Sequence, residues 1–271
     1  MWRFHGDDVA AAQGLIEAAL AVGITLFDTA DIYGVDTDGF GAAEALLGRV
    51  LAASPGLRER MVLATKGGIV PGTPYDSSPD YLARALDASL QRLGLEQVDL
   101  WQIHRPDLLA HPQETARALE AMVASGKVRT IGVSNFTPAQ VAALTAFLTI
   151  PLASTQPEFS PLHLDPMWDG TLDQAMALDL AVLAWSPLGG GRLGSGDGEV
   201  ARLLAAQGER FGISVAAATY SWLLAHPARP IPIVGSQRPE RIAEAADAFR
   251  VSWTRAEWYA VLQASMGEKL P

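Results

Sequence analysis

Short apolar segments alternate regularly with longer segments of helical periodicity, and this alternation restricts the chain to few folds. Most of the short segments are apolar on both faces, as in parallel strands that helices cover on both sides. The segments predicted as strands are Ile24–Phe27, Met61–Thr65, Val98–Ile103, Val128–Val133, Leu152–Gln156, Ala181–Trp185 and Ile231–Val234. The amphipathic segments predicted as helices are Ala10–Val22, Asp80–Leu93, Glu114–Ser125, Ala139–Phe147 and Val200–Phe211.

Strand-then-helix alternation with right-handed crossovers leaves two architectures, an open doubly wound sheet or a closed barrel. No Gly-x-Gly-x-x-Gly motif follows an early strand, which disfavours an open dinucleotide-binding sheet. The length of 271 residues suits a single-domain barrel, and no linker, repeat or low-complexity segment divides the chain. We therefore predict an α/β fold, a (β/α)8 (TIM) barrel that forms one domain over residues 1–271.

The first strand of such a barrel is hard to find in this sequence. Only Trp2–Phe4 remains to form it, because a helix is expected to begin near Asp7. A barrel that lacks one strand has an exposed seam. Either Met1–Phe4 is a very short strand or the natural chain extends upstream, and we favour the second. The first strand is predicted to be truncated or missing.

Composition excludes several classes of protein. The net charge of −10 disfavours binding to nucleic acid or to an anionic membrane surface. The absence of cysteine rules out disulfides and thiolate nucleophiles, and the five histidines lack metal-ligand spacing, so no metal is predicted. No apolar run approaches the roughly 18 residues of a membrane span, and the N-terminus lacks the apolar core of a signal peptide. We expect a soluble, cytoplasmic protein, with no indication of its oligomeric state.

Polar residues follow consecutive predicted strands at their C-terminal ends, where barrel enzymes place their active sites. Asp28 and Tyr33 follow one strand, Lys66 the next and His104 the third. Each residue alone is more often structural: a lysine is a surface charge, an aspartate is a helix cap, and a histidine is a satisfied core residue. Four such residues on adjacent strands form a more specific pattern.

These residue types together suit the reduction of a carbonyl group, which needs a hydride donor and an acid for the developing alkoxide. Tyrosine has an ordinary pKa of about 10, and a nearby ammonium is expected to lower it. Lys66 supplies the ammonium, and Asp28 keeps it charged and oriented. His104 donates a hydrogen bond that polarises the carbonyl, and Tyr33 delivers the proton as the general acid.

At these positions the sequence resembles the aldo-keto reductases. The resemblance rests on the segments 28–34 (Asp-Thr-Ala-Asp-Ile-Tyr-Gly), 103–107 (Ile-His-Arg-Pro-Asp) and 132–136 (Gly-Val-Ser-Asn-Phe), and on Lys66. It covers nearly the whole chain and is closest to a bacterial subgroup of uncharacterised oxidoreductases, on the basis of the loop 185–192. It implies a barrel enzyme that reduces a small aldehyde or ketone to an alcohol, usually with NADPH.

The resemblance also implies the residues that bind the cofactor. Ser134, Asn135 and Gln156 match residues that hold the nicotinamide carboxamide, and Trp185 matches an aromatic residue that stacks on the nicotinamide ring. Trp185 alone would more often be a core residue. The following loop adds Ser186, Leu188, Gly189 and Arg192, and Glu244 matches a contact to adenine.

A second signal for the cofactor follows the last predicted strand. This segment contains Gly235, Ser236, Gln237, Arg238 and Arg241, with Pro239 at a helix start. Helix N-termini attract phosphate, and arginines suit a 2′-phosphate, which favours NADPH over NADH. A solvated basic patch is the alternative reading. The family often has lysine where Gly235 stands and asparagine where Ala245 stands, and the usual N-terminal hairpin is absent.

Two other functions remain open from the sequence. The first is a nicotinamide-binding regulatory or sensor protein that turns over little substrate. The second is a Schiff-base aldolase that uses Lys66, because barrels place lysines at strand ends. The arginine segment at 238–241 has no role in an aldolase.

Overall fold

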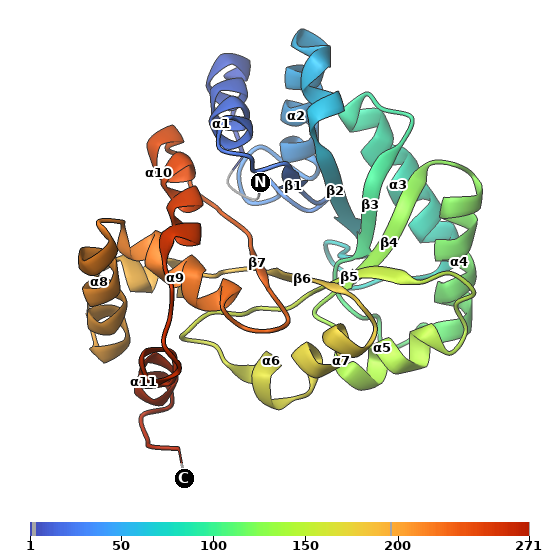
Figure 1. Ribbon diagram of the computed structural model, residues 1–271. Coiled ribbons are helices and arrows are strands. Elements are labelled where there is room, and N and C mark those ends of the chain that lie inside the picture. The colour runs from blue at the N-terminus through green and yellow to red at the C-terminus, as the bar shows by residue number, and fades with distance from the viewer. Residues whose placement is uncertain (2–3, 196, 271) are drawn as a thin grey trace. The chain divides into compact units, whose positions relative to one another are not determined.

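The structure is a computed structural model that describes residues 1, 4–195 and 197–270 (Figure 1). The chain forms two compact units. The first contains Met1–Gln156 and Gly235–Pro239, and the second contains Pro157–Val234 and Glu240–Pro271. The expectation of one domain over residues 1–271 stays a prediction.

The first unit is a parallel sheet whose strands pair in chain order. Five strands follow one another: β1 (Leu26–Asp28), β2 (Val62–Gly67), β3 (Val98–Ile103), β4 (Val128–Ser134) and β5 (Leu152–Gln156). The helices of this unit are α1 (Val9–Ala21), α2 (Ala42–Ala53), the 3-10 helix η1 (Pro55–Arg60), α3 (Pro79–Leu93), α4 (Pro112–Ala124) and α5 (Pro138–Thr145). Figure 1 shows α3, α4 and α5 along the outer side of this sheet.

The second unit continues the strand-helix alternation. Its strands β6 (Ala181–Ala184) and β7 (Ile231–Pro232) pair in parallel. Its helices are α6 (Asp165–Trp168), α7 (Thr171–Ala177), η2 (Gly189–Ser195), α8 (Glu199–Phe211), α9 (Val215–Leu224), α10 (Pro239–Glu244), η3 (Ala245–Arg250) and α11 (Arg255–Met266). The indoles of Trp222 and Trp258 stack at 4.8 Å between centroids and tie α9 to α11.

The sequence places the elements well where local signals are strong. The predicted bounds of β3 and β5 match those of the structure, and Thr137 and Thr254 form the capping boxes that open α5 and α11. β1 begins later than predicted because the Ile24 amide donates to the Ala19 carbonyl at the end of α1, at 3.0 Å. Trp185 lies just beyond β6, in an isolated parallel bridge with Glu158.

The predicted first strand at Trp2–Phe4 falls largely outside the described residues, because these do not include 2 and 3. Phe4 itself is buried and is not part of a strand, and its amide donates to the Met1 carbonyl at 2.8 Å. No described helix is long and apolar enough to cross a membrane. Among the described residues, no group of three or more His, Asp or Glu side chains is arranged to hold a metal.

Candidate active site

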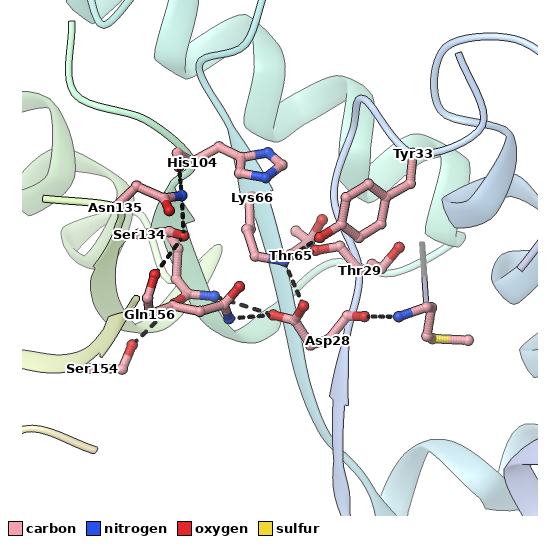
Figure 2. Close-up of polar contacts among 12 residues, drawn as sticks. Asp28, Thr29, Tyr33, Thr65, Lys66, His104, Ser134, Asn135, Ser154 and Gln156 are labelled. Atoms are coloured by element: carbon pink, nitrogen blue, oxygen red, sulfur yellow. Dashed lines mark hydrogen bonds and ion pairs between the residues drawn. The ribbon is translucent and has the colours of Figure 1, made fainter. Parts of the chain in front are cut away.

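Three of the predicted catalytic residues form a chain of contacts at the ends of β1 and β2, in which Asp28 and Lys66 are buried and Tyr33 is partly buried. The Lys66 ammonium donates to Asp28 Oδ2 at 2.5 Å, to the Thr29 carbonyl at 2.9 Å and to the Tyr33 hydroxyl at 3.1 Å (Figure 2). The side chains of Lys66 and Asp28 are 0% and 4% exposed. All three ammonium hydrogens therefore have acceptors, and the lysine is fixed against Tyr33.

The backbone after β1 explains how Tyr33 reaches this position. The Thr29 and Asp31 amides extend the pairing with β2, because they donate to the carbonyls of Ala64 and Lys66 at 2.9 and 3.0 Å. The chain then turns at Gly34, whose φ is +101°. A Cβ at this position would lie 2.7 Å from the Ala42 Cβ, so the turn that presents Tyr33 requires glycine here.

His104 follows β3 and completes the group. Its backbone amide donates to the Gly67 carbonyl at 2.9 Å, and its ring meets the Tyr33 ring edge-on, with centroids 5.7 Å apart. Burial, helped by the nearby Lys66 charge, lowers the pKa of His104 to about 3. The imidazole is neutral at pH 7, so it can donate one hydrogen bond to a carbonyl oxygen but does not carry an extra proton.

Asp28 and Lys66 each favour the ionised form of the other. Burial alone would raise the pKa of Asp28. The charge and hydrogen bond of the Lys66 ammonium, together with smaller effects such as the Gln156 hydrogen bond, outweigh burial and hold that pKa below its usual value. Burial alone would lower the pKa of Lys66, but Asp28 and Tyr33 together hold it above its usual value. Both groups are therefore ionised at neutral pH.

The expected lowering of the Tyr33 pKa is wrong. Burial raises the pKa of the phenol, and the attraction of the Lys66 ammonium offsets only part of that effect. Sequence reasoning considered the ammonium but could not weigh the depth at which the phenol is buried. Tyr33 consequently holds its proton firmly at neutral pH, in the protonation state that a general acid needs.

An amide and hydroxyl cluster adjoins these residues at the ends of β4 and β5 (Figure 2). The Asn135 side-chain amide donates to the His104 carbonyl at 3.0 Å and to the Ser134 hydroxyl at 2.9 Å. The Ser134 hydroxyl donates to the Gln156 carbonyl at 2.9 Å, and the Gln156 amide donates to Asp28 Oδ1 at 2.9 Å. The structure therefore joins the three predicted carboxamide contacts to the Asp28–Lys66 pair in one network.

Sequence reasoning missed two members of this network. The Gln102 amide donates to Asp28 Oδ1 at 3.3 Å, and the Gln102 side-chain carbonyl accepts from the Ser154 hydroxyl at 3.3 Å. Both residues are fully or almost fully buried. The sequence did contain a signal for them, because each is a polar residue inside a strand predicted to be buried. A polar side chain buried in a sheet needs a hydrogen-bond partner, so the two could have been predicted to belong to a buried polar network.

The predicted stacking residue and its loop lie in the second unit. The Trp185 backbone pairs with the segment 157–159, because its amide donates to the Pro157 carbonyl and its carbonyl accepts from the Phe159 amide. Ser186 adopts a left-handed backbone with φ +51°, and Leu188 leads into η2. The Arg192 side chain donates to the Gly189 carbonyl at 2.8 Å, which holds this glycine-rich turn together.

The predicted phosphate segment divides between the two units. Gly235, Ser236, Gln237 and Arg238 belong to the first, and Arg241 and Glu244 belong to the second. Pro239 begins α10 as predicted, and the Ser236 hydroxyl accepts from the Arg238 amide at 3.1 Å. Both arginines are exposed, and neither forms an ion pair within the described parts of the chain.

The donor set of the first unit fits a nicotinamide cofactor. A carboxamide needs both donors and acceptors, and Ser134, Asn135 and Gln156 offer hydroxyl and amide groups of both kinds. These groups are bonded to the same Asp28 and His104 that flank Tyr33. A nicotinamide held there would lie close to Tyr33.

Comparison with known proteins agrees with this arrangement. Residues 1–265 match the family model described as "Aldo/keto reductase family". The whole chain is 59% identical to the 6-dehydroglucose reductase of Novosphingobium aromaticivorans, of which it covers 91%, and 41% identical to that of Agrobacterium fabrum, of which it covers 94%. Two further bacterial matches, from Escherichia coli and Bacillus subtilis, are named only as oxidoreductases, as the sequence resemblance predicts.

A solved structure confirms the fold class. The glycerol dehydrogenase AKR11B4 of Gluconobacter oxydans superposes with a TM-score of 0.84 at 28% identity, over 98% of this chain and 89% of that one. The fold is the predicted (β/α)8 type, with seven strands in the described residues and the first strand truncated or missing. The chain belongs to the aldo/keto reductase family.

Proposed function

We propose that this protein reduces an aldehyde or ketone to an alcohol with NADPH, and that Tyr33 is the general acid. The observation that carries the proposal is the chain of contacts from the buried Asp28–Lys66 pair to the Tyr33 hydroxyl. The family and the names of its relatives support carbonyl reduction by a nicotinamide-dependent oxidoreductase. The four catalytic roles and the choice of NADPH belong to the proposal.

Each residue contributes one part of the proton transfer. NADPH, when bound, supplies the hydride, and Ser134, Asn135 and Gln156 would hold its carboxamide. The neutral His104 donates a hydrogen bond to the carbonyl oxygen and withdraws electron density from the carbonyl carbon. Tyr33 then gives its hydroxyl proton to that oxygen, which becomes the alcohol.

The ion pair supports the phenolate that this step leaves behind. Lys66 lies 3.1 Å from the Tyr33 oxygen, so its positive charge stabilises the phenolate, and Asp28 keeps the lysine charged and in place. Tyr33 recovers its proton from solvent after the alcohol leaves. One carbonyl, one NADPH and one proton yield one alcohol and one NADP⁺.

The cofactor preference is inferred from the exposed arginines. Arg238 and Arg241 present unpaired guanidinium groups near the start of α10, and such groups pair well with a phosphate monoester. Within the proposal, Trp185 stacks on the nicotinamide, Glu244 contacts adenine, and the 186–192 loop and the 235–238 segment hold the rest of the cofactor.

The relatives suggest a substrate. Two relatives that match the whole chain, at 59% and 41% identity, are named 6-dehydroglucose reductases. We infer that this chain takes the same substrate, a glucose in which carbon 6 is oxidised to an aldehyde, and returns it to glucose. A cytoplasmic location and the absence of nucleic-acid partners stay predictions.

The structure disfavours the aldolase reading. A Schiff base needs an uncharged, accessible amine. Lys66 is fully buried, donates three hydrogen bonds and has a pKa above its usual value because of Asp28 and Tyr33, which outweigh its burial. This lysine is therefore a poor nucleophile.

The direct test compares the natural chain with Tyr33→Phe. The natural chain should oxidise NADPH in the presence of 6-dehydroglucose, and the variant should lose about 10²- to 10⁴-fold of that rate. Because the ring remains, NADPH binding measured by fluorescence titration should change little. If the natural chain binds NADPH without turning over any aldehyde, the protein is a nicotinamide-binding sensor or regulator and the proposed reductase function is wrong. A variant as active as the natural chain would remove Tyr33 from the role of acid.

A further inference from the structure

A second aspartate, Asp31, lies next to the catalytic group and has no part in the mechanism above. It is 1% exposed, and within the described residues neither of its carboxyl oxygens has a hydrogen-bond partner. The Ile32 amide lies near enough to favour the charged form, without reaching hydrogen-bond geometry. A buried carboxyl without partners costs free energy, so its presence needs an explanation.

The backbone holds Asp31 next to Lys66, with the two side chains on opposite sides of β2. The Asp31 amide donates to the Lys66 carbonyl at 3.0 Å. Side chains alternate along a strand, so Lys66 points to Asp28 while its neighbours Thr65 and Gly67 face the other side of β2. The Asp31 carboxyl lies on that other side: a Cβ on Gly67 would stand 3.2 Å from Asp31 Oδ2 and 2.7 Å from the Trp101 ring. Only glycine leaves room for this carboxyl.

Three elements bring charged or titratable groups towards Asp31, and β3 brings the uncharged Trp101. From α2 comes Glu44, which is fully buried and accepts hydrogen bonds from the Thr65 hydroxyl and, at 2.7 Å, from Arg92. From α3 come Arg92 and Tyr81, and from β2 comes Lys66. Burial and the Glu44 charge raise the pKa of Asp31 to about 8, against the opposing effect of Arg92 and Lys66.

We propose that Asp31 is a positioning residue for the reduction, which acts from behind β2 to set how readily Tyr33 releases its proton. The inference rests on the proposed function, because it concerns the same proton transfer. With Asp31 protonated, the charges that act on Tyr33 are those of Lys66 and Asp28. When Asp31 loses its proton to solvent, a second negative charge acts on Tyr33 and on the ammonium that stabilises its phenolate.

The sign of the effect follows from the charges. A negative charge nearby disfavours the phenolate and raises the pKa of Tyr33, so Tyr33 becomes a weaker acid. Reduction should therefore slow as the pH rises through the pKa of Asp31. The protonated carboxyl keeps the reductase fast at neutral pH, and its ionisation slows the enzyme in alkali.

The kinetic test measures kcat/KM between about pH 6 and about pH 10 for three proteins. The natural chain should lose about threefold or more of its rate around pH 8. Asp31→Asn keeps the shape of the side chain but cannot ionise, so this decline should disappear. Asp36→Asn, an equal charge change at an exposed site in the same loop, should keep the decline. An Asp31→Asn profile that keeps the decline, or a loss of rate equal at every pH, would overturn the proposal.

A second readout needs no turnover and no variant at position 31. Infrared difference spectra of the natural chain, taken between about pH 6 and about pH 10, should show the carbonyl stretch of a protonated carboxyl disappear near pH 8. A phenol band should shift with it, and the same titration of Tyr33→Phe should lack that phenol shift. If these bands appear in a chain that reduces no aldehyde, the proposed function fails while the coupling stands. If the carboxyl titrates near its ordinary pKa, or the phenol does not respond, the inference fails.

Discussion

At the scale of single residues, the Asp28–Lys66 pair shows how a buried charge depends on its partner. The two side chains are almost fully buried and 2.5 Å apart. Two buried charges are tolerated when they neutralise one another and have hydrogen bonds, and here Gln156 and Thr29 supply further bonds. Removing one partner leaves the other charged and desolvated.

Lys66→Met should therefore destabilise the fold as well as stop the reaction. We expect a loss of about 3–5 kcal/mol in the free energy of unfolding, measured in urea at neutral pH, because Asp28 loses its counter-charge. The double variant Asp28→Asn with Lys66→Met should recover much of that loss, while the reductase stays inactive. A double variant less stable than the single one would show that the pair is not coupled in this way.

The exposed Arg241 allows a test of cofactor preference. A charge-assisted hydrogen bond contributes about 1.5–3 kcal/mol, so Arg241→Ala should weaken NADPH binding by roughly tenfold or more. NADH lacks the 2′-phosphate and should be bound almost as before. The control is Arg202→Ala, which removes an exposed arginine from α8. Equal losses for both cofactors in fluorescence titrations would exclude Arg241 as the residue that recognises the 2′-phosphate.

Residue positions were easier to predict than residue energetics. Asp28, Tyr33, Lys66 and His104 follow strands, and parallel strands bring such residues to one edge, so their proximity could be read from the sequence. The pKa of Tyr33 could not, because it depends on burial by residues distant in the chain. The unusual environment of Asp31 was not predicted for a similar reason. It depends on the space that Gly67 leaves for the carboxyl and on the charge of Glu44 in α2.

At the scale of elements, short-range signals were reliable, whereas the ends of some strands, such as β1 and β7, were not predicted correctly. The Thr137 capping box could be predicted because all its groups lie within four residues. β7 was predicted over Ile231–Val234 but ends at Pro232, although the Ile233 amide still donates to the Ala184 carbonyl of β6 at 2.9 Å. The length of a strand depends on its neighbour, which local sequence does not contain.

The α5 cap gives a prediction at this scale. The Thr137 hydroxyl accepts from the Gln140 amide at 3.3 Å, and the Gln140 side chain accepts from the Thr137 amide at 2.9 Å. Thr137→Ala should lower the free energy of unfolding by about 1 kcal/mol in urea, because the first of these bonds is lost. Thr137→Ser keeps the hydroxyl and should cost much less. Similar losses in the two variants would mean that the hydroxyl does not cap the helix.

At the scale of the whole molecule, the repeated strand-helix pattern was enough to predict the fold class. Apolar strands separated by amphipathic helices have few packing solutions, and the family and the superposed dehydrogenase confirm the barrel type. The division of the chain into two compact units could not be predicted from the sequence pattern. It depends on which helices pack together, as α9 and α11 do through Trp222 and Trp258.

The stability of the whole fold should depend on acid through His104. In the folded protein, burial lowers the pKa of this histidine to about 3, whereas an unfolded histidine has a pKa of about 6.5. Between these values the unfolded chain binds a proton that the folded protein does not. The free energy of unfolding therefore falls as the pH drops below the unfolded value, by about 2 kcal/mol at pH of about 5.

Urea unfolding of the natural chain and of His104→Gln, at pH of about 7 and about 5, tests this linkage. Glutamine keeps a hydrogen-bonding side chain but does not titrate, so the variant should lose about 2 kcal/mol less on acidification. His5→Gln, at an exposed position, should behave like the natural chain. If His104→Gln is as acid-sensitive as the natural chain, other groups cause the loss. His226 is then the first to consider, because burial also lowers its pKa.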